Sequence, residues 1–137
     1  MKRSLTVLAA GALLASSAVF VVSAAQADVM TTVPSSSLTV TDWYKQDVYD
    51  QSNNKIGQVA DVLVGQDGQV NALIIGVGGF LGAGEKDVAV SFNTVKATMK
   101  DNKIYLTMNT TKDALKSAPG FKYDSNKTAW VPDPSSR

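Results

Sequence analysis

The residue types that perform most enzyme chemistry are missing from this chain. Its 137 residues include neither cysteine nor histidine. This excludes thiol nucleophiles, thiolate metal sites and disulfides, together with the side chain most often used as a general base or zinc ligand. Carboxylates remain for acid–base chemistry, and three of them lie within or beside apolar segments: Asp61, Glu85 and Asp87.

Asp61 stands between Ala60 and Val62 in an apolar stretch. A buried carboxylate either handles protons or accepts backbone hydrogen bonds that hold a turn, and we expect the structural role here. Glu85 and Asp87 are expected to form a solvated strand entry. A hydrolase built on paired carboxylates is the alternative, but a chain this short offers no evident cleft for a polymer.

The glycine-rich segment 76–84 resembles phosphate-binding loops, but its spacing is wrong. A dinucleotide fingerprint needs glycine at Leu81, and a P-loop needs lysine at Glu85. We therefore predict a long connection between strands, whose central Phe80 and Leu81 either fold back over the domain or face a partner. The candidate partner contact is Gly78, Gly79, Phe80, Leu81 and Gly82.

No cofactor or metal site is predicted. Residues 50–61 approach the spacing of an EF-hand loop, but Lys55 occupies the position of its glycine and Asp61 that of its glutamate. A hairpin turn at residues 52–54 explains the same residues.

The N-terminus predicts export. Lys2 and Arg3 precede an apolar run over residues 5–22, and Ala25 and Ala27 are the small residues that precede a signal-peptidase cut. We expect residues 1–27 to be removed after Ala27, which places the mature protein in the periplasm without a stable membrane anchor. An uncleaved anchor is the alternative, since the run is just long enough to span a bilayer.

The mature chain would be one small domain of nearly neutral charge. Removal of Lys2 and Arg3 leaves 11 basic and 12 acidic residues. This balance argues against binding of nucleic acid or of an anionic membrane surface. Residues 28–39 are expected to form a flexible linker, residues 40–123 the folded domain, and residues 124–137 a flexible tail in which Trp130 alone suggests docking.

The clearest local structure is a hairpin that turns at Asp101 and Asn102. Apolar and polar residues alternate over 95–100 and again over 103–108, which is typical of strands with one buried face. A two-residue turn pairs residues whose numbers sum to 203, and that register brings the apolar residues together on one face.

A second hairpin is predicted between residues 56–64 and 70–77, with a type I′ turn at Asp67 and Gly68. Both of its strands are apolar on both faces, so a covering segment or a partner should lie outside them. Further strands are predicted at 47–50 and 88–92, and a single helix at 111–118 ends at Pro119. Trp43 and Tyr44 should supply core or lid surface. Together these elements predict an all-β fold, a small barrel of five or six antiparallel strands with one short C-terminal helix.

Several segments together resemble the PRC-barrel family. They are DVYD at 47–50, KIG at 55–57, GVGGFLG at 76–82 and EKDVAV at 85–90, and the resemblance covers residues 40–123. It implies a small, strongly bent β-barrel that serves as a docking module and has no shared catalytic residues. We therefore expect a non-enzymatic periplasmic protein that binds another envelope protein or itself. A small-ligand carrier that uses the barrel mouth is the alternative.

Overall fold

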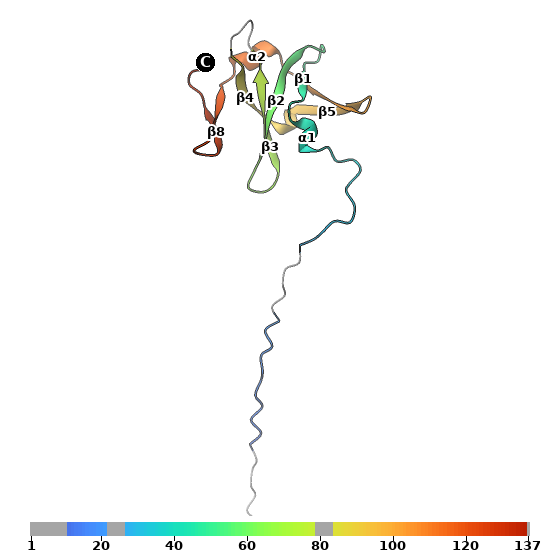
Figure 1. The fold of residues 1–137 in the computed structure, drawn as a ribbon, viewed down its shortest axis with the longest axis vertical. Coiled ribbons are helices and arrows are strands. Elements are labelled where there is room, and N and C mark those ends of the chain that lie inside the picture. Colours follow the sequence, from blue (N-terminus) through green and yellow to red (C-terminus); the bar gives the residue numbers. More distant parts are fainter. Residues whose placement is uncertain (1–10, 22–26, 79–83, 137) are drawn as a thin grey trace, which may run out of the picture. The chain divides into compact units, whose positions relative to one another are not determined.

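The computed structural model describes residues 11–21, 27–78 and 84–136, and the chain divides into two units, residues 1–33 and 34–137. The described residues of the first unit are exposed and contain no helix or strand. Across the described ranges, no helix is both long and apolar enough to cross a membrane. The secondary structure of these ranges lies in the second unit (Figure 1).

The second unit is built on one sheet of eight strands, which confirms the all-β prediction. Its order is β5-β6-β1-β2-β3-β4-β7-β8, and within the described residues β5 and β8 do not pair to close it. The strands are β1 (Asp47–Tyr49), β2 (Lys55–Val64), β3 (Val70–Val77), β4 (Lys86–Ser91), β5 (Val95–Lys100), β6 (Lys103–Met108), β7 (Phe121–Asp124) and β8 (Ala129–Pro132).

The β5–β6 hairpin has the predicted register in all six residue pairs, from Val95 with Met108 to Lys100 with Lys103. Asp101 and Asn102 both have positive φ, at 52° and 59°, as a two-residue turn of type I′ requires. One expected detail is wrong. Met99 lies on the apolar face, but it is 60% exposed because this end of the hairpin extends beyond the core.

The sheet is not purely antiparallel, because β1 pairs in parallel with β6. The cause is the 3-10 turn η1 (Phe92–Thr94) between β4 and β5. A hairpin there would reverse the chain, whereas η1 makes a corner, so that β5 keeps the direction of β4 within the sheet. The next strand, β6, then returns in the direction of β1. Figure 1 shows β5 extending to one side and running crosswise to the upright β3, so the sheet is strongly bent.

The turn between β2 and β3 differs from the type I′ prediction. Gly68 has a φ of 81°, but Asp67 is not among the residues with positive φ. The carbonyl of Gly65 accepts from the N–H of Gly68 (2.9 Å), and the N–H of Gly65 donates to the carbonyl of Gln69 (2.7 Å). This is a three-residue loop that ends in a left-handed glycine, the form in which a bulge follows a type I turn.

A single hydrophobic core lies inside the bent sheet. It gathers buried residues from β1 to β6, among them Val48, Ile75 and Leu106. Helix α2 (Lys112–Ser117) adds Leu115 and confirms the predicted helix; the Thr111 side chain caps it, and Asp113 lies in its first turn. A second helix, α1 (Val40–Trp43), was not predicted.

Helix α1 brings Trp43 into this core. Its single turn is held by a capping box, in which Thr39 and Asp42 each accept the other's backbone N–H at 3.0–3.1 Å. The indole of Trp43 is 8% exposed and its ring centroid lies 4.8 Å from that of Phe92. Of the two neighbouring aromatic residues, Trp43 is therefore core, while Tyr44 stays half exposed.

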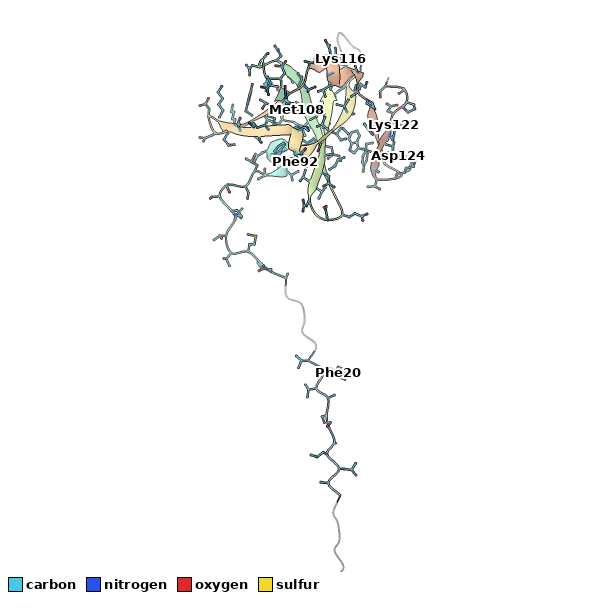
Figure 2. All side chains as sticks on the ribbon, turned by 180° about the vertical axis from the view of Figure 1, so that it is seen from behind. Phe20, Phe92, Met108, Lys116, Lys122 and Asp124 are labelled. Carbon is cyan, nitrogen blue, oxygen red and sulfur yellow. The ribbon has the colours of Figure 1, made fainter. Side chains whose placement is uncertain are left out.

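The predicted flexible tail is wrong for residues 124–132. They complete the β7–β8 hairpin, which continues the sheet beyond β4 through the pairing of Asp87 with Phe121. The alternation of Phe121 and Tyr123 with Lys122, at the end of the predicted domain, indicates a strand that needs residues 129–132 as its partner. Figure 2 shows Lys122 and Asp124 on this hairpin, on the opposite side of the folded unit from β5.

Candidate interaction surfaces and structural carboxylates

The glycine-rich connection joins the ends of β3 and β4, whose last pair is Val77 with Lys86. Of the five residues predicted to contact a partner, the structure describes Gly78, which is exposed. The other four, Gly79, Phe80, Leu81 and Gly82, lie outside the described residues, so their role stays a prediction. The prediction that this segment connects two strands is confirmed, because β3 precedes it and β4 follows it.

A shallow groove of about 270 Å³ lies beside this connection. Its lining carries both signs of charge, with the cations of Lys55 and Lys112 and the carboxylate of Glu85. The ammonium of Lys55 is 2.8 Å from a carboxylate oxygen of Asp47, and the side chain of Glu85 rests against Gly76. The groove is open to solvent, as a surface contact site would be.

The Asp87 carboxyl lies on β4, next to this connection, and its pKa is shifted by its surroundings. Burial, with a smaller contribution from the charge of Glu85, raises the pKa of the Asp87 carboxyl. The neighbouring Lys86 points elsewhere, because its ammonium donates to the carbonyl of Lys116 at 2.6 Å. The folded protein therefore holds the protonated form of Asp87 more readily than the unfolded chain does.

This shift predicts a pH-dependent effect of Asp87→Asn. A raised pKa in the fold contributes stability below the ordinary aspartate value of about 3.9, and that contribution is lost as pH rises through the raised pKa. We expect the variant to melt a few degrees above the parent at pH 7 and at nearly the same temperature at pH 3. Thermal denaturation followed by circular dichroism at the two pH values measures the difference. A variant that melts lower than the parent at pH 7 contradicts the assignment.

Asp61 lies at a β-bulge on β2. The pairing of β2 with β3 shifts between Val59 and Asp61, so Ala60 is an extra residue. Side chains alternate between the two faces of a strand, and one extra residue reverses the faces that follow. The bulge thus places Asp61 on the outer face and returns Val62 to the core side, where it packs against the hydrophobic core.

The Asp61 carboxylate accepts two hydrogen bonds. One oxygen accepts the backbone N–H of Val62 at 2.8 Å, and the other accepts the indole N–H of Trp130 at 2.7 Å. Ile74 pairs with Asp61 on the same outer face and is fully buried, although it does not belong to the main core. Since Trp130 belongs to β8, this hydrogen bond brings the β7–β8 hairpin to the outer face of β2, and we infer that the hairpin supplies the cover expected for the doubly apolar strands.

The residues that resemble a calcium loop form a turn. The Asp50 carboxylate accepts the backbone N–H groups of Ser52 and Asn54, both at 2.8 Å, and the side-chain amide of Asn54 at 3.0 Å. The side-chain amide and then the backbone N–H of Asn54 lower the pKa of Asp50. Among the described residues, no group of three or more His, Cys, Asp or Glu side chains is placed to hold a metal ion.

A pair of tyrosines on the outer face was not singled out from the sequence. Tyr49 on β1 and Tyr105 on β6 stack with centroids 4.8 Å apart, and the hydroxyl of Tyr105 donates to the side chain of Asn53. The ammonium of Lys100 lies 5.9 Å from the centroid of the Tyr105 ring. Alternation along 103–108 placed Tyr105 outside, but its contact with Tyr49 depends on the parallel pairing of β1 with β6.

Comparison with known proteins agrees with this architecture. The sequence model of the PRC-barrel domain matches residues 37–115, which is more than half of the chain. No curated protein matches the chain. The matched range spans β1 to β6 and most of α2, the part of the fold that encloses the hydrophobic core. The chain belongs to the PRC-barrel domain family.

Proposed function

We propose that this chain is an exported PRC-barrel protein that acts in the periplasm as a non-enzymatic protein-interaction module. The N-terminal signal pattern supports export. The filled interior of the sheet is the observation that carries the interaction role. Val48, Val59, Leu73 and Leu106 are all fully buried within one continuous core, which leaves the outer surface for recognition.

The filled interior also weighs against the alternative of a small-ligand carrier. Such a carrier needs an enclosed cavity that buries most of its ligand. The grooves on the described surface are open, with volumes from about 270 to 560 Å³, and small barrels are generally filled by their own side chains. Because the core side chains occupy the inside, a partner would meet the strand edges, the loops and the outer face.

Export is tested by cell fractionation and N-terminal sequencing of the protein expressed from its full sequence. We expect the mature protein in the periplasmic fraction, with Asp28 as its first residue. Replacement of Ala25 and Ala27 by bulky residues should block processing and retain the longer form. Recovery of protein that still begins at Met1 in the cytosol would overturn the proposed location.

The interaction role of the glycine-rich connection is tested by the double substitution Phe80→Ser and Leu81→Ser. We expect it to reduce crosslinked capture of a periplasmic partner several-fold while the melting temperature stays unchanged. Val29→Ser with Val33→Ser is the matched control, because it removes two exposed apolar residues from the linker instead. Equal capture by the parent and the Phe80/Leu81 variant would remove this connection as the contact.

A further inference from the structure

We propose that the free edge of β5 binds an extended, acidic segment of another protein as an added strand. The inference depends on the proposed interaction role, and it names both a surface and the chemistry of the partner. Its elements are an unpaired sheet edge, a row of lysines on one side of that edge, and exposed apolar surface on the other.

The first element is the edge itself. Within the described part of the chain, β5 pairs with β6 alone and forms one end of the sheet. The two-residue turn makes Lys100 and Lys103 a hydrogen-bonded pair, and such pairs alternate with non-hydrogen-bonded ones. Ala97 and Met99 therefore direct their backbone N–H and C=O groups away from β6. An extended peptide can pair with these groups, as in strand addition to a sheet edge.

The second element is positive charge on the outer face of the hairpin. Lys96 and Lys100 alternate with Ala97 and Met99 along β5, and Lys103 faces Lys100 across the ladder. All three lysines are exposed, and none takes part in the ion pairs recorded among the described residues. The nearest carboxylate in sequence is Asp101 in the turn, which leaves a net positive charge on this face.

The third element is apolar surface on the inner face. Met99 is 60% exposed and borders a groove of about 450 Å³ with a mixed lining, in which Leu38, Tyr44 and Ile104 lie beside Asp42, Gln46 and Lys103. Leu38 and Tyr44 are themselves 39% and 50% exposed. An added strand would place alternate side chains on the lysine side and on the Met99 side, because successive residues of a strand point to opposite faces.

The free edge, the lysines and the exposed apolar side chains together indicate which kind of chain would bind at β5. A second copy pairing through its own β5 would set lysines against lysines across the new ladder, and like charges at that position are destabilising. A segment in which acidic residues alternate with apolar residues satisfies both faces at once. The lysines thus discourage self-association while they attract an acidic partner, which is how charge sets specificity at an interface.

The probe for the test is a fluorescein-labelled octapeptide in which glutamate alternates with valine. We expect it to bind the mature protein in an anisotropy titration, and we expect the affinity to fall as salt rises. Lys96→Glu with Lys100→Glu should weaken binding roughly tenfold or more, because attraction becomes repulsion. Lys127→Glu changes an exposed lysine in the β7–β8 turn, at the other end of the sheet, and should alter affinity by less than about twofold.

Backbone pairing is tested separately from charge. Ala97→Pro removes one outward N–H of the edge strand without removing a bond of the β5–β6 ladder, and it should weaken binding several-fold while the melting curve is retained. The same peptide carrying N-methyl groups at alternate residues should bind about as poorly, because it cannot form a ladder. Amide resonances of Ala97 and Met99 should shift and gain exchange protection when the unmodified peptide is added.

Binding that is equal for the parent and the Lys96/Lys100 variant overturns the proposal, as does equal binding of the N-methylated peptide. Self-association of the protein in place of peptide binding overturns it too. Failure of the wider interaction role is distinguishable. If the peptide does not bind but capture of a periplasmic partner persists, only the β5 edge is wrong. If the peptide binds but no periplasmic partner is captured, the interaction role is wrong.

Discussion

Replacement of Gly57 by alanine should lower the free energy of unfolding by about 3 kcal/mol, the upper end of typical overpacking costs. A Cβ at this position would lie 2.6 Å from the side chain of Ile75 and 2.9 Å from the carbonyl oxygen of Gly76. Both neighbours are buried, and one is backbone of the adjacent strand, so β2 and β3 would have to separate. Urea denaturation of the parent and the variant, followed by circular dichroism, measures the loss.

Gly76→Ala is the matched control, because it adds the same methyl group to the facing strand. There the new Cβ would meet the side chain of Glu85, which is exposed and can turn away. We expect a cost below about 1 kcal/mol, close to that of an ordinary surface substitution. Equal losses for the two variants would show that the close approach of β2 and β3 at Gly57 does not limit the fold.

Replacement of Trp130 by alanine should cost about 2–3 kcal/mol, somewhat less than for a fully buried tryptophan because this side chain is only partly buried. The indole donates to the Asp61 carboxylate on the outer face of β2 at 2.7 Å. Its loss removes the hydrogen bond that ties β8 to β2 and leaves one Asp61 oxygen without its donor. Chemical denaturation measures the change, and proteolysis should now cut the β7–β8 turn more rapidly.

Trp130→Phe separates the two contributions of the indole. It keeps an aromatic ring at this position but removes the donor, so it should lose only the hydrogen bond, about 1 kcal/mol, and stay clearly more stable than Trp130→Ala. Asp61→Asn retains an acceptor and should cost less than Asp61→Ala. Unchanged stability in Trp130→Ala would mean that the hairpin beyond β4 contributes nothing to the fold, and that residues 124–137 behave as the sequence-based tail prediction supposed.

Local signals in the sequence were sufficient to predict the β5–β6 hairpin and its register. The turn at Asp101 and Asn102 and the alternation on both sides selected the same register, so each supported the other. Helix α2 was equally predictable, because a capping residue, a first-turn acidic residue and a terminating Pro-Gly all lie within ten residues of one another. The doubly apolar strands β2 and β3 correctly indicated that something must cover their outer face.

Other features depend on contacts between residues far apart in the chain. Alternation cannot reveal the bulge at Ala60, because the stretch around it is apolar on both faces. The parallel pairing of β1 with β6 follows from the corner that η1 makes. The three residues Phe92–Thr94 carry no sequence pattern that predicts this corner. Helix α1 is one turn long, too short for periodicity, although the spacing of Thr39 and Asp42 matches a capping box.

The candidate contact surfaces were only partly predictable. The lysines of β5 fall on the outer face by alternation alone, so their common side could be assigned from the sequence. The position of β5 at a sheet edge could not be assigned from the sequence. Edges depend on the strand order, and in this order β1 is inserted between β6 and β2. Trp130 was visible as a residue that might dock, but its acceptor Asp61 is 69 positions away.

We propose that this PRC-barrel protein works through its outer surface after export. The most direct measurement is affinity purification of a C-terminally tagged chain from the periplasmic fraction, with quantitative mass spectrometry of everything that elutes. We predict that the form beginning at Asp28 elutes with a protein partner in near-equal amount, and that the Lys96/Lys100 double variant loses it. Elution of the chain alone from the periplasm would contradict the interaction role, and its recovery only from the cytosol would contradict export.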